Sequence, residues 1–306
     1  MYKILICDPI HEAGITMMER NGLAVEVKPQ ITSSALKQVV GNYDALVIRS
    51  RTKVPMDVIK LGKRLKAIGR VGVGLDNIDL HAAAINSIAV FNSPEASAEA
   101  VAELTIGLML SLARKIPFAD NSMKNQKWVK KQMTGWLLEG KTLGLLGLGN
   151  IGLRVAVIAK ALGMNILVTK RTPPKAKLLA DLRGKYVPLS ELLIRSDIVS
   201  IHIPLNEQTR HLLSDKEFAI MKNGAYLINT ARGAIVDETA LYNALQTGKL
   251  GGAALDVYER EPPINSLITP LTNVICTPHI GGQTTESQSK AAEIIAEKII
   301  NYLNEN

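Results

Sequence analysis

Cysteine, aromatic residues and long apolar runs are all scarce in this sequence of 306 residues. Its two cysteines, Cys7 and Cys276, rule out a disulfide scaffold, and both lie in runs that predict buried strands. We therefore expect two free core thiols and a reducing compartment, the cytoplasm. No apolar run approaches the ~20 residues of a membrane span, and the N-terminus has no signal-peptide pattern. These absences predict a cytoplasmic protein that does not contact a membrane.

The low aromatic content, 4%, also argues against a stacking platform for single-stranded nucleic acid. Lysine and arginine number 36 against 28 aspartates and glutamates, a net charge of +8, but the basic residues are spread along the chain with acids among them. We therefore expect no nucleic-acid partner and no metal site. The basic excess is better suited to attracting small anionic substrates or cofactors.

Short β-rich runs alternate with helical patterns from one end of the chain to the other. The first series of expected strands comprises Tyr2–Cys7, Ala24–Val27, Ala45–Ile48, Ala67–Val71 and Ala89–Phe91. The second comprises Thr142–Leu146, Ile166–Thr169, Ile198–His202, Ala225–Asn229, Ala253–Val257 and Val274–Thr277. Apolar strands that alternate with helices indicate parallel sheets covered on both faces. The sequence thus predicts an α/β protein with two doubly wound, Rossmann or flavodoxin-like domains.

A helix is expected between the two series, opened by Ser93-Pro94-Glu95 and ended near Lys115-Ile116-Pro117. Its apolar residues leave little polar face, so we expect it to be buried nearly all round. Two interpretations stay open: simple core, or a bridging helix that also packs on another subunit of a homodimer. We predict a discontinuous substrate-binding domain, 1–95 plus 284–306, and a dinucleotide-binding domain, 96–283.

The sharpest local motif is a glycine-rich turn between an expected strand and an apolar helix. It reads Gly147-Leu148-Gly149-Asn150-Ile151-Gly152. In this context the first glycine permits the tight turn, the second admits a pyrophosphate, and the third lets the helix pack on the strand. The helix N-terminus then offers free N–H groups to the phosphates. The motif predicts a bound dinucleotide.

The next strand ends without the acid that would hold the adenosine ribose of NAD. Thr169, Lys170 and Arg171 stand there instead. Two cations and a hydroxyl suit the 2′-phosphate of NADP. We expect NAD(P) as cofactor, with NADP favoured and NAD still possible.

Polar groups also gather at the carboxyl ends of the other strands in the second series, where open α/β sheets bind ligands. They are His202, Thr230-Ala231-Arg232-Gly233, Asp256 and His279. Hydride transfer to or from a 2-hydroxy acid needs such types, because a histidine can carry the hydroxyl proton and an arginine can hold the carboxylate. A carboxylate on the far side of the imidazole would orient the ring. Composition alone cannot choose between Glu259 and Glu261 for this role.

Together these residues resemble the D-isomer-specific 2-hydroxyacid dehydrogenase family, over essentially the whole chain. The specific pieces are the glycine turn, His202-Ile203-Pro204-Leu205, Asn229-Thr230-Ala231-Arg232-Gly233, Asp256 to Pro263 and Thr277-Pro278-His279-Ile280-Gly281-Gly282. The resemblance implies that Arg232, Glu261 and His279 are catalytic, which selects Glu261 over Glu259. It also implies cofactor contacts from the glycine turn, the Thr169–Arg171 loop, His202, Ile203, Pro204, Thr230, Ala231, Asp256, Gly281 and Gly282.

The first domain is most similar to the branch of that family that acts on 3-phosphoglycerate. The similarity lies in Ile48 to Val54 and Gly69 to Asp79. It implies a substrate loop at Ile48 to Val54 and a second loop, with Val73, Gly74 and Asn77, whose backbone amides hold the carboxylate. The cations at the strand ends of the first domain form a basic set that suits a substrate phosphate: Arg49, Arg51, Lys53 and Arg70. The leading substrate pair is therefore 3-phosphoglycerate and 3-phosphohydroxypyruvate, as in serine biosynthesis.

Two other functions remain open. Lys170 and Arg171 favour an NADP-dependent glyoxylate or hydroxypyruvate reductase. A protein-binding module that senses dinucleotides is the non-enzymatic alternative, because the family resembles known corepressors, although the complete catalytic set disfavours it. Because the chain stops at Asn306, we expect no C-terminal regulatory domain and no feedback by serine.

Overall fold

The computed structural model describes residues 1–305 and divides the chain into two compact units. Unit 1 comprises Met1–Ala100 and Gly282–Asn306, and unit 2 comprises Val101–Gly281. The sequence placed these boundaries near residues 95 and 284. Each unit is an α/β sandwich around a parallel sheet, so the predicted fold class, with a discontinuous first domain, is confirmed.

Unit 1 contains a five-stranded parallel sheet in the order β2-β1-β3-β4-β5. The strands are β1 (Lys3–Ile6), β2 (Ala24–Val27), β3 (Ala45–Ile48), β4 (Ala67–Arg70) and β5 (Ala89–Asn92). This is the flavodoxin-like order, which reverses direction between β1 and β3. The loops that follow those two strands therefore meet at the switch point of the sheet.

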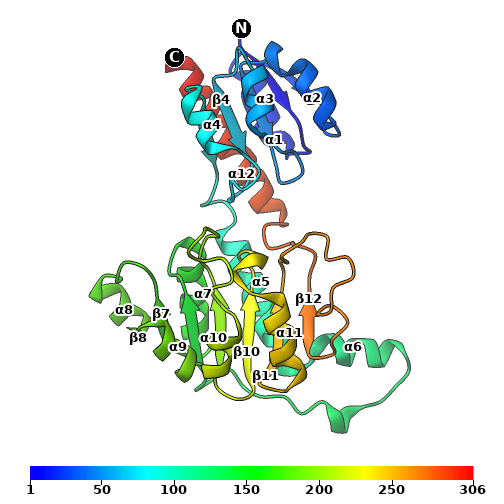
Figure 1. Ribbon diagram of the computed structural model, residues 1–306, viewed down its shortest axis with the longest axis vertical. Helices are drawn as coiled ribbons and strands as arrows, with labels where there is room; N and C mark the ends of the chain where they lie inside the picture. The colour runs from blue at the N-terminus through cyan, green and yellow to red at the C-terminus, as the bar shows by residue number, and fades with distance from the viewer. Residues whose placement is uncertain (306) are drawn as a thin grey trace. The chain divides into compact units, whose positions relative to one another are not determined.

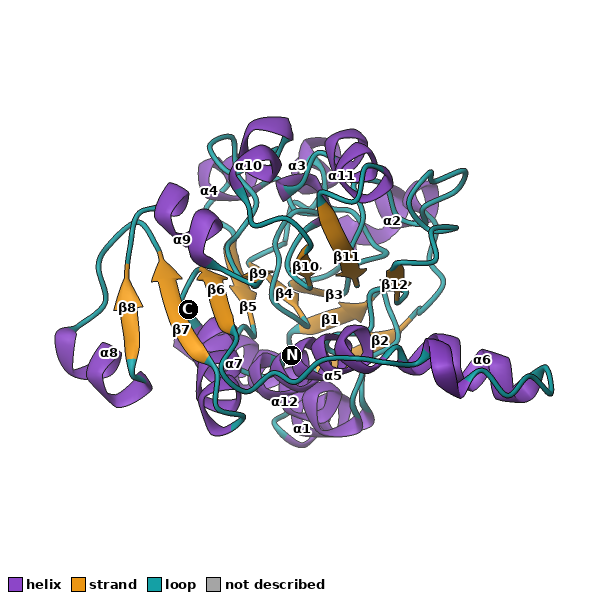
Figure 2. Cartoon of the chain, turned by 90° about the horizontal axis from the view of Figure 1, so that it is seen from below, coloured by secondary structure: helices purple, strands orange, loops and turns teal. Residues whose placement is uncertain are grey.

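Helices cover both faces of this sheet (Figures 1 and 2). One face carries α1 (Glu12–Arg20) and α12 (Thr285–Glu305). The other carries α2 (Ser33–Val39), α3 (Met56–Leu61) and α4 (Leu80–Ile85), with a 3₁₀ turn, η1, at Val40–Asn42. A Cβ at Gly14 would come within 2.7 Å of the Ala292 carbonyl oxygen, so glycine lets α1 and the returning C-terminal helix touch. This contact fixes α12 in unit 1.

Unit 2 contains a seven-stranded parallel sheet in the order β12-β11-β10-β9-β6-β7-β8. The strands are β6 (Thr142–Leu146), β7 (Asn165–Thr169), β8 (Gly184–Tyr186), β9 (Ile198–Ile201), β10 (Ala225–Asn229), β11 (Leu250–Leu255) and β12 (Val274–Cys276). The order is that of a Rossmann sheet with one further strand at the edge. Its switch point lies between β6 and β9.

Two apolar layers enclose the unit 2 sheet (Figure 2). One contains α5 (Ala98–Arg114), α7 (Asn150–Ala161) and the end of α8 (Ala176–Leu182). The other contains α9 (Leu189–Arg195), α10 (Asp215–Ile220) and α11 (Glu238–Gln246). Alternate strand residues serve the two layers: Leu143 and Leu145 belong to the first, and Leu146 to the second. Within residues 1–305, no helix is long and apolar enough to cross a membrane.

The helix that follows β5 starts later than expected and ends where expected. The helix α5 begins at Ala98, because the Ser93 hydroxyl accepts from the Gly72 N–H in place of capping a helix. The end of this helix agrees with the expectation near Lys115-Ile116-Pro117: α5 ends at Arg114, because Lys115 adopts a left-handed conformation. A new helix, α6 (Ile116–Lys124), then starts with Pro117 in its first turn. A 3₁₀ turn, η2 (Lys130–Gln132), follows.

Cys276 is exposed because β12 is an edge strand, whereas Cys7 is buried as expected, and both are free thiols. The helix α5 is also not buried all round. One stripe of its surface is exposed, formed by Glu99, Glu103, Gly107, Leu110 and Arg114.

Candidate active site

The glycine-rich turn joins β6 to α7 at the switch point of unit 2. Gly147 has φ +98°, and a Cβ there would lie 2.4 Å from the His202 carbonyl oxygen. A Cβ at Gly152 would come equally close, 2.4 Å, to the Gly147 carbonyl oxygen. These two glycines are required by the packing of the turn itself.

Gly149 is different. It precedes the first helical residue, Asn150, with φ −84°, and an added Cβ would meet no protein atom within 4 Å. Neither the backbone conformation nor the neighbouring protein therefore demands glycine at position 149. An open approach to the N-terminus of α7, where Ile151 follows, is what a bound pyrophosphate needs.

The loop after β7 carries the two cations expected near the adenosine ribose. Thr169 and Lys170 are half-buried, and Arg171 is exposed. The Tyr186 hydroxyl of β8, a strand that the sequence analysis missed, donates to the Lys170 carbonyl oxygen at 3.2 Å. Within residues 1–305, neither Lys170 nor Arg171 forms an ion pair with a carboxylate. Both charges therefore remain available to an anion.

His202 follows β9, directly across the switch point from the glycine turn, and Ile203 and Pro204 continue the chain. The His202 Nε2 lies 2.9 Å from the Ser200 Oγ. Although the residue as a whole is half-buried, its surroundings desolvate the imidazole, and this lowers its pKa to about 3. The ring is thus neutral around pH 7 and is not suited to proton transfer.

Arg232 lies in the turn after β10, which is shaped by a buried amide. Asn229, itself within the motif that the sequence analysis quoted, donates from Nδ2 to the Arg232 carbonyl oxygen at 2.9 Å and accepts from the Ala231 N–H at 3.0 Å. The Thr230 hydroxyl pairs with that of Thr105 on α5 at 2.9 Å. Asn229 and Thr105 are supporting residues that sequence reasoning did not single out; an amide at a strand end is a weak signal, and Thr105 gives none.

Asp256, after β11, organises the loop that carries His279. Its carboxylate is buried and accepts from the Thr277 hydroxyl at 2.6 Å, the Ile280 N–H at 2.8 Å and the Gly281 N–H at 2.8 Å. The expected cofactor contact of Asp256 therefore competes with three hydrogen bonds inside the protein. Gly282, the next glycine, already belongs to unit 1.

The same geometry brings together the acid and the base of the expected catalytic set. The His279 Nδ1 lies 2.8 Å from the Glu261 Oε2, and His279 has φ +53°, a left-handed conformation that is costly for a non-glycine residue. Burial works to raise the pKa of Glu261, but the hydrogen bond and charge of His279, with the charge of Arg232, outweigh it, so the pKa lies below its ordinary value. The pair is therefore an ionised carboxylate that orients an imidazole.

Unit 1 presents a second group of predicted residues at its own switch point, after β3. Asp8, which directly follows the β1 run, is buried and pairs with Arg51 at 2.8 Å. Arg51 also donates to the carbonyl oxygens of Cys7, Pro29 and Ile31, at 2.5, 3.0 and 3.1 Å. Its guanidinium is thus engaged within the protein.

The remaining members of this group differ from Arg51. Arg49 is half-buried, with its Nη1 3.4 Å from the Pro9 carbonyl oxygen. Lys53 is exposed, and no hydrogen bond or ion pair holds its ammonium within residues 1–305. Asn77 fixes the loop by donating to the carbonyl oxygens of Arg49 and Thr52 at 2.7 and 2.6 Å.

The loop after β4 contains backbone N–H groups that donate to no acceptor within residues 1–305. Gly72, at φ +139°, accepts the Ser93 N–H at 2.9 Å, and the Val73 carbonyl oxygen accepts from Asn92 at 2.6 Å. In the part of the chain that the structure describes, the N–H groups of Val73 and Gly74 meet no protein acceptor. They could receive a carboxylate.

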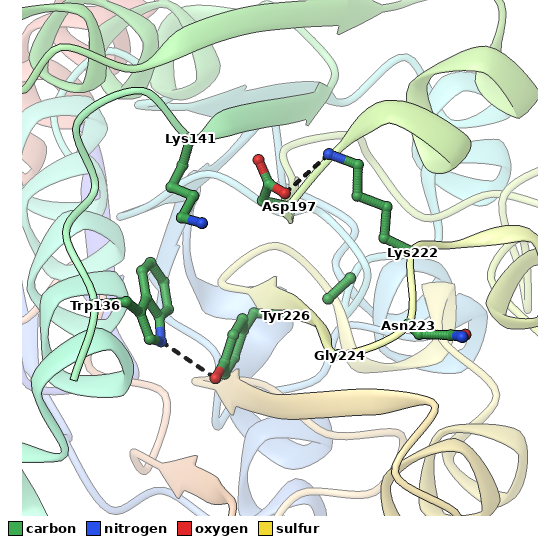
Figure 3. Close-up of a pocket in the computed structure, with 8 residues that line it drawn as sticks. Trp136, Lys141, Asp197, Lys222, Asn223, Gly224 and Tyr226 are labelled. Atoms are coloured by element: carbon green, nitrogen blue, oxygen red, sulfur yellow. Dashed lines mark hydrogen bonds and ion pairs between the residues drawn. The ribbon is translucent and has the colours of Figure 1, made fainter. Parts of the chain in front are cut away.

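A separate hollow of about 280 Å³ lies at the opposite, amino-terminal edge of the unit 2 sheet (Figure 3). The Trp136 ring packs against Tyr226 at an angle of 37°, with ring centroids 4.9 Å apart, and donates from Nε1 to its hydroxyl at 3.2 Å. Lys222 pairs with Asp197 at 2.9 Å, and Lys141 points toward the hollow. None of the predicted site residues lines it, so it does not belong to the candidate active site. Nor do the described residues contain three or more His, Cys, Asp or Glu side chains placed to hold a metal ion.

Known proteins resemble this chain in sequence and in fold. Residues 106–281, nearly all of unit 2, match the model of the D-isomer specific 2-hydroxyacid dehydrogenase, NAD binding domain. A D-3-phosphoglycerate dehydrogenase of Methanocaldococcus jannaschii is 47% identical over 98% of this chain, which spans 57% of that relative's length. A hydroxypyruvate reductase of Thermotoga maritima is 44% identical and is matched over 99% of this chain and 98% of its own.

A solved structure resembles the chain over nearly its full length. It is an acyclic imino acid reductase in complex with NADPH and D-Arg, which is 30% identical, has a TM-score of 0.89 and is matched over 99% of this chain and 97% of its own.

Proposed function

Because this chain belongs to the D-isomer specific 2-hydroxyacid dehydrogenase family, we propose that it interconverts a D-2-hydroxy acid and the corresponding 2-oxo acid with NAD(P). The observation that carries this proposal is the contact of 2.8 Å between His279 and Glu261 in the same unit as Arg232 and the glycine turn. A structural ion pair would not need His279 in a left-handed conformation.

Each of the three residues has a distinct role in this chemistry. The nicotinamide, when bound, supplies or accepts the hydride. His279 donates a proton to the oxygen of the 2-oxo group during reduction and removes it during oxidation. Glu261 holds the imidazole through Nδ1 and so fixes the orientation of the ring. Arg232 polarises the oxo group or anchors the carboxylate, since a guanidinium binds such oxygens through charge-assisted hydrogen bonds.

The residues of unit 2 fit a dinucleotide. Gly147 and Gly152 build the turn, the open side of Gly149 admits the pyrophosphate, and the N-terminus of α7 faces it. Lys170 and Arg171 would hold a 2′-phosphate, so we propose that NADPH is preferred to NADH. The NADPH complex of the imino acid reductase shows that a relative of this fold takes that cofactor.

For the substrate, we propose 3-phosphohydroxypyruvate and 3-phosphoglycerate. The M. jannaschii relative is named for 3-phosphoglycerate, and the similarity covers 98% of this chain. In unit 1 the unsatisfied N–H groups of Val73 and Gly74 would bind the carboxylate. Lys53 and Arg49 are the cations suited to the phosphate, whereas Arg51 is already held by Asp8.

A second candidate is an NADP-dependent reductase of hydroxypyruvate or glyoxylate. Two observations favour it: the basic pair Lys170 and Arg171, and a hydroxypyruvate reductase that is matched over 98% of its own length. This activity would need no cation at Lys53.

A panel of 2-oxo acids, with and without a phosphate group and assayed with NADPH and NADH, tests both candidates. We expect the highest kcat/KM for 3-phosphohydroxypyruvate with NADPH. Higher values for glyoxylate or hydroxypyruvate would favour the reductase. Cofactor binding without turnover of any 2-oxo acid would favour the dinucleotide sensor and contradict both enzymatic proposals.

We also propose a homodimer that forms through α5, α6 and the segment after them. Apolar side chains are unusually exposed along this stretch: Leu110, Ile116, Phe118, Met123, Trp128 and Leu137 are 37–77% exposed. Exposed apolar side chains that are concentrated in one stretch of the chain favour an interface. Sedimentation equilibrium should give twice the chain mass, and Phe118→Asp should shift it to the monomer. A monomeric unmodified protein would contradict the dimer.

A further inference from the structure

Glu259, the acid that composition alone could not separate from Glu261, is bound to the start of α11. The Glu238 N–H donates to the Glu259 Oε1 at 3.0 Å, and the Glu259 N–H donates to the Glu238 Oε1 at 2.8 Å. This reciprocal pair ties the Tyr258–Glu261 turn to the N-terminus of a nine-residue helix. A helix N-terminus favours a carboxylate at that position.

A histidine holds the same carboxylate from another side. The His211 Nε2 lies 3.1 Å from the Glu259 Oε1, and its Nδ1 lies 4.0 Å from the Asp237 Oδ2. The backbone of His211 is itself fixed, because its N–H donates to the Ala234 carbonyl oxygen at 2.8 Å. His211 therefore links Glu259 to the cap residue of α11.

Gly233 explains how this clasp can act on the catalytic set. A Cβ at Gly233 would fall 1.8 Å from the Tyr258 carbonyl carbon and 2.4 Å from the Glu259 nitrogen. The turn that ends in Arg232 thus packs directly against the backbone of the turn that carries Glu261. A displacement of Glu259 would therefore move both the turn that ends in Arg232 and the turn that carries Glu261.

We propose that Glu259, held by Glu238 and His211, is a positioning residue that sets the place of Glu261 against His279. This inference rests on the proposed function, since it assigns a purpose to the Glu261–His279 pair. Only Arg260 separates Glu259 from Glu261, and the Glu261 Oε1 accepts from the Tyr258 N–H at 3.2 Å, so the turn transmits a shift between them.

The charge arrangement agrees with a functional purpose. Burial and the adjacent charge of Glu259 raise the pKa of Glu238, in spite of its hydrogen bond from the Glu259 backbone. Two neighbouring carboxylates repel each other, which costs free energy unless other interactions compensate. Here the two hydrogen bonds between Glu238 and Glu259 fix the turn, and the His211 imidazole can bind the Glu259 Oε1, which also accepts from the Glu238 N–H.

The decisive variants are Glu259→Ala and Glu259→Gln. Removing the side chain should lower kcat about tenfold, because small misplacements of reacting groups are costly, while the KM for the 2-oxo acid and the cofactor Kd change less than about twofold. Glutamine keeps an oxygen for both hydrogen bonds and should restore most of kcat. Glu297→Ala, an exposed glutamate of α12, is the matched control and should change nothing.

Two further measurements separate positioning from a merely structural role. In a Glu261→Gln background, Glu259→Ala should have no additional effect on kcat, because the residue through which it acts is gone. The titration of the Glu261 carboxyl, followed by ¹³C NMR, should move to higher pH in Glu259→Ala.

Additive effects in the double variant, or a lowered melting temperature with unchanged kcat and an unchanged Glu261 titration, would overturn the inference. If the unmodified protein turned over no 2-oxo acid, the proposed function would fail first, and the NMR titration would still decide whether Glu259 positions Glu261.

Discussion

The two sheets of this protein carry charged and polar residues at equivalent places, the switch points after their central strands, but use them differently. In unit 1 the charged groups bind other groups of the protein: Asp8 is buried, and Arg51 binds it together with three backbone carbonyl oxygens. In unit 2 the turn after β6 is uncharged, and Gly149 faces open space. The switch point of unit 1 therefore stabilises the fold, whereas that of unit 2 leaves room for a ligand.

The difference teaches that a basic residue at a strand end is not by itself a ligand site. Arg51 and Lys53 are two residues apart and equally basic in sequence, yet one has a buried carboxylate as partner and the other is exposed. Arg51 is engaged because Asp8, which follows the neighbouring strand β1, reaches its guanidinium and not the ammonium of Lys53. After β7, no carboxylate within residues 1–305 pairs with Lys170 or Arg171.

The largest effect should come from the open switch point of unit 2. His279→Ala removes the proton donor, so kcat should fall by about 10²–10⁴, while NAD(P) binding measured by fluorescence titration stays nearly unchanged. Near-full kcat in this variant would show that the Glu261–His279 pair is as structural as the Asp8–Arg51 pair.

The cofactor loop should give the next largest effect. Lys170→Asp with Arg171→Ala should move the ratio of kcat/KM values from NADPH toward NADH, by about tenfold or more for each charge-assisted hydrogen bond to the 2′-phosphate that is removed. Lys175→Ala, which removes a nearby cation of the same unit, serves as the control. Equal use of both cofactors by the unmodified protein would mean that these cations are merely solvated.

Much of this organisation could be predicted because the relevant signals are local. Apolar strands bounded by turns predicted eleven of the twelve strands within residues 1–305, and the glycine turn located the switch point of unit 2. The strand β8 was missed because its three residues, Gly184, Lys185 and Tyr186, carry no apolar run.

The remaining differences depend on tertiary contacts that a sequence does not display. Ser93 was expected to cap a helix and instead binds the Gly72 backbone across the chain. The engagement of Arg51 depends on four acceptors from two distant loops. The position of His279 against Glu261 was available only through family resemblance, because 18 residues separate them.

A smaller effect should distinguish the two basic residues of unit 1. Arg51→Ala leaves the buried Asp8 without its cation and should lower the free energy of unfolding by about 1–3 kcal/mol, measured by urea denaturation. Lys53→Ala should leave stability unchanged and raise the KM for 3-phosphohydroxypyruvate, but not for glyoxylate. If Arg51→Ala kept full stability, the contrast between the two switch points would disappear.

The smallest effect concerns pH. The folded-state pKa of Glu261 lies below its ordinary value of 4.5, so the unfolded chain binds a proton first as the pH falls. The stability that this carboxylate contributes is present above about pH 4.5 and is lost as the pH falls through the folded-state pKa. The stability advantage of the unmodified protein over Glu261→Gln should therefore shrink between pH 6 and pH 3. Parallel stability curves would contradict the ionised pair.

The stereochemical course of reduction tests the central claim most directly. With NADPH and 3-phosphohydroxypyruvate, the unmodified protein should form one equivalent of the D-2-hydroxy acid for each NADPH consumed, as determined by chiral chromatography, and His279→Ala should form almost none. Formation of the L-isomer, or binding of NADPH without consumption of any 2-oxo acid, would contradict the assignment of Arg232, Glu261 and His279 to catalysis.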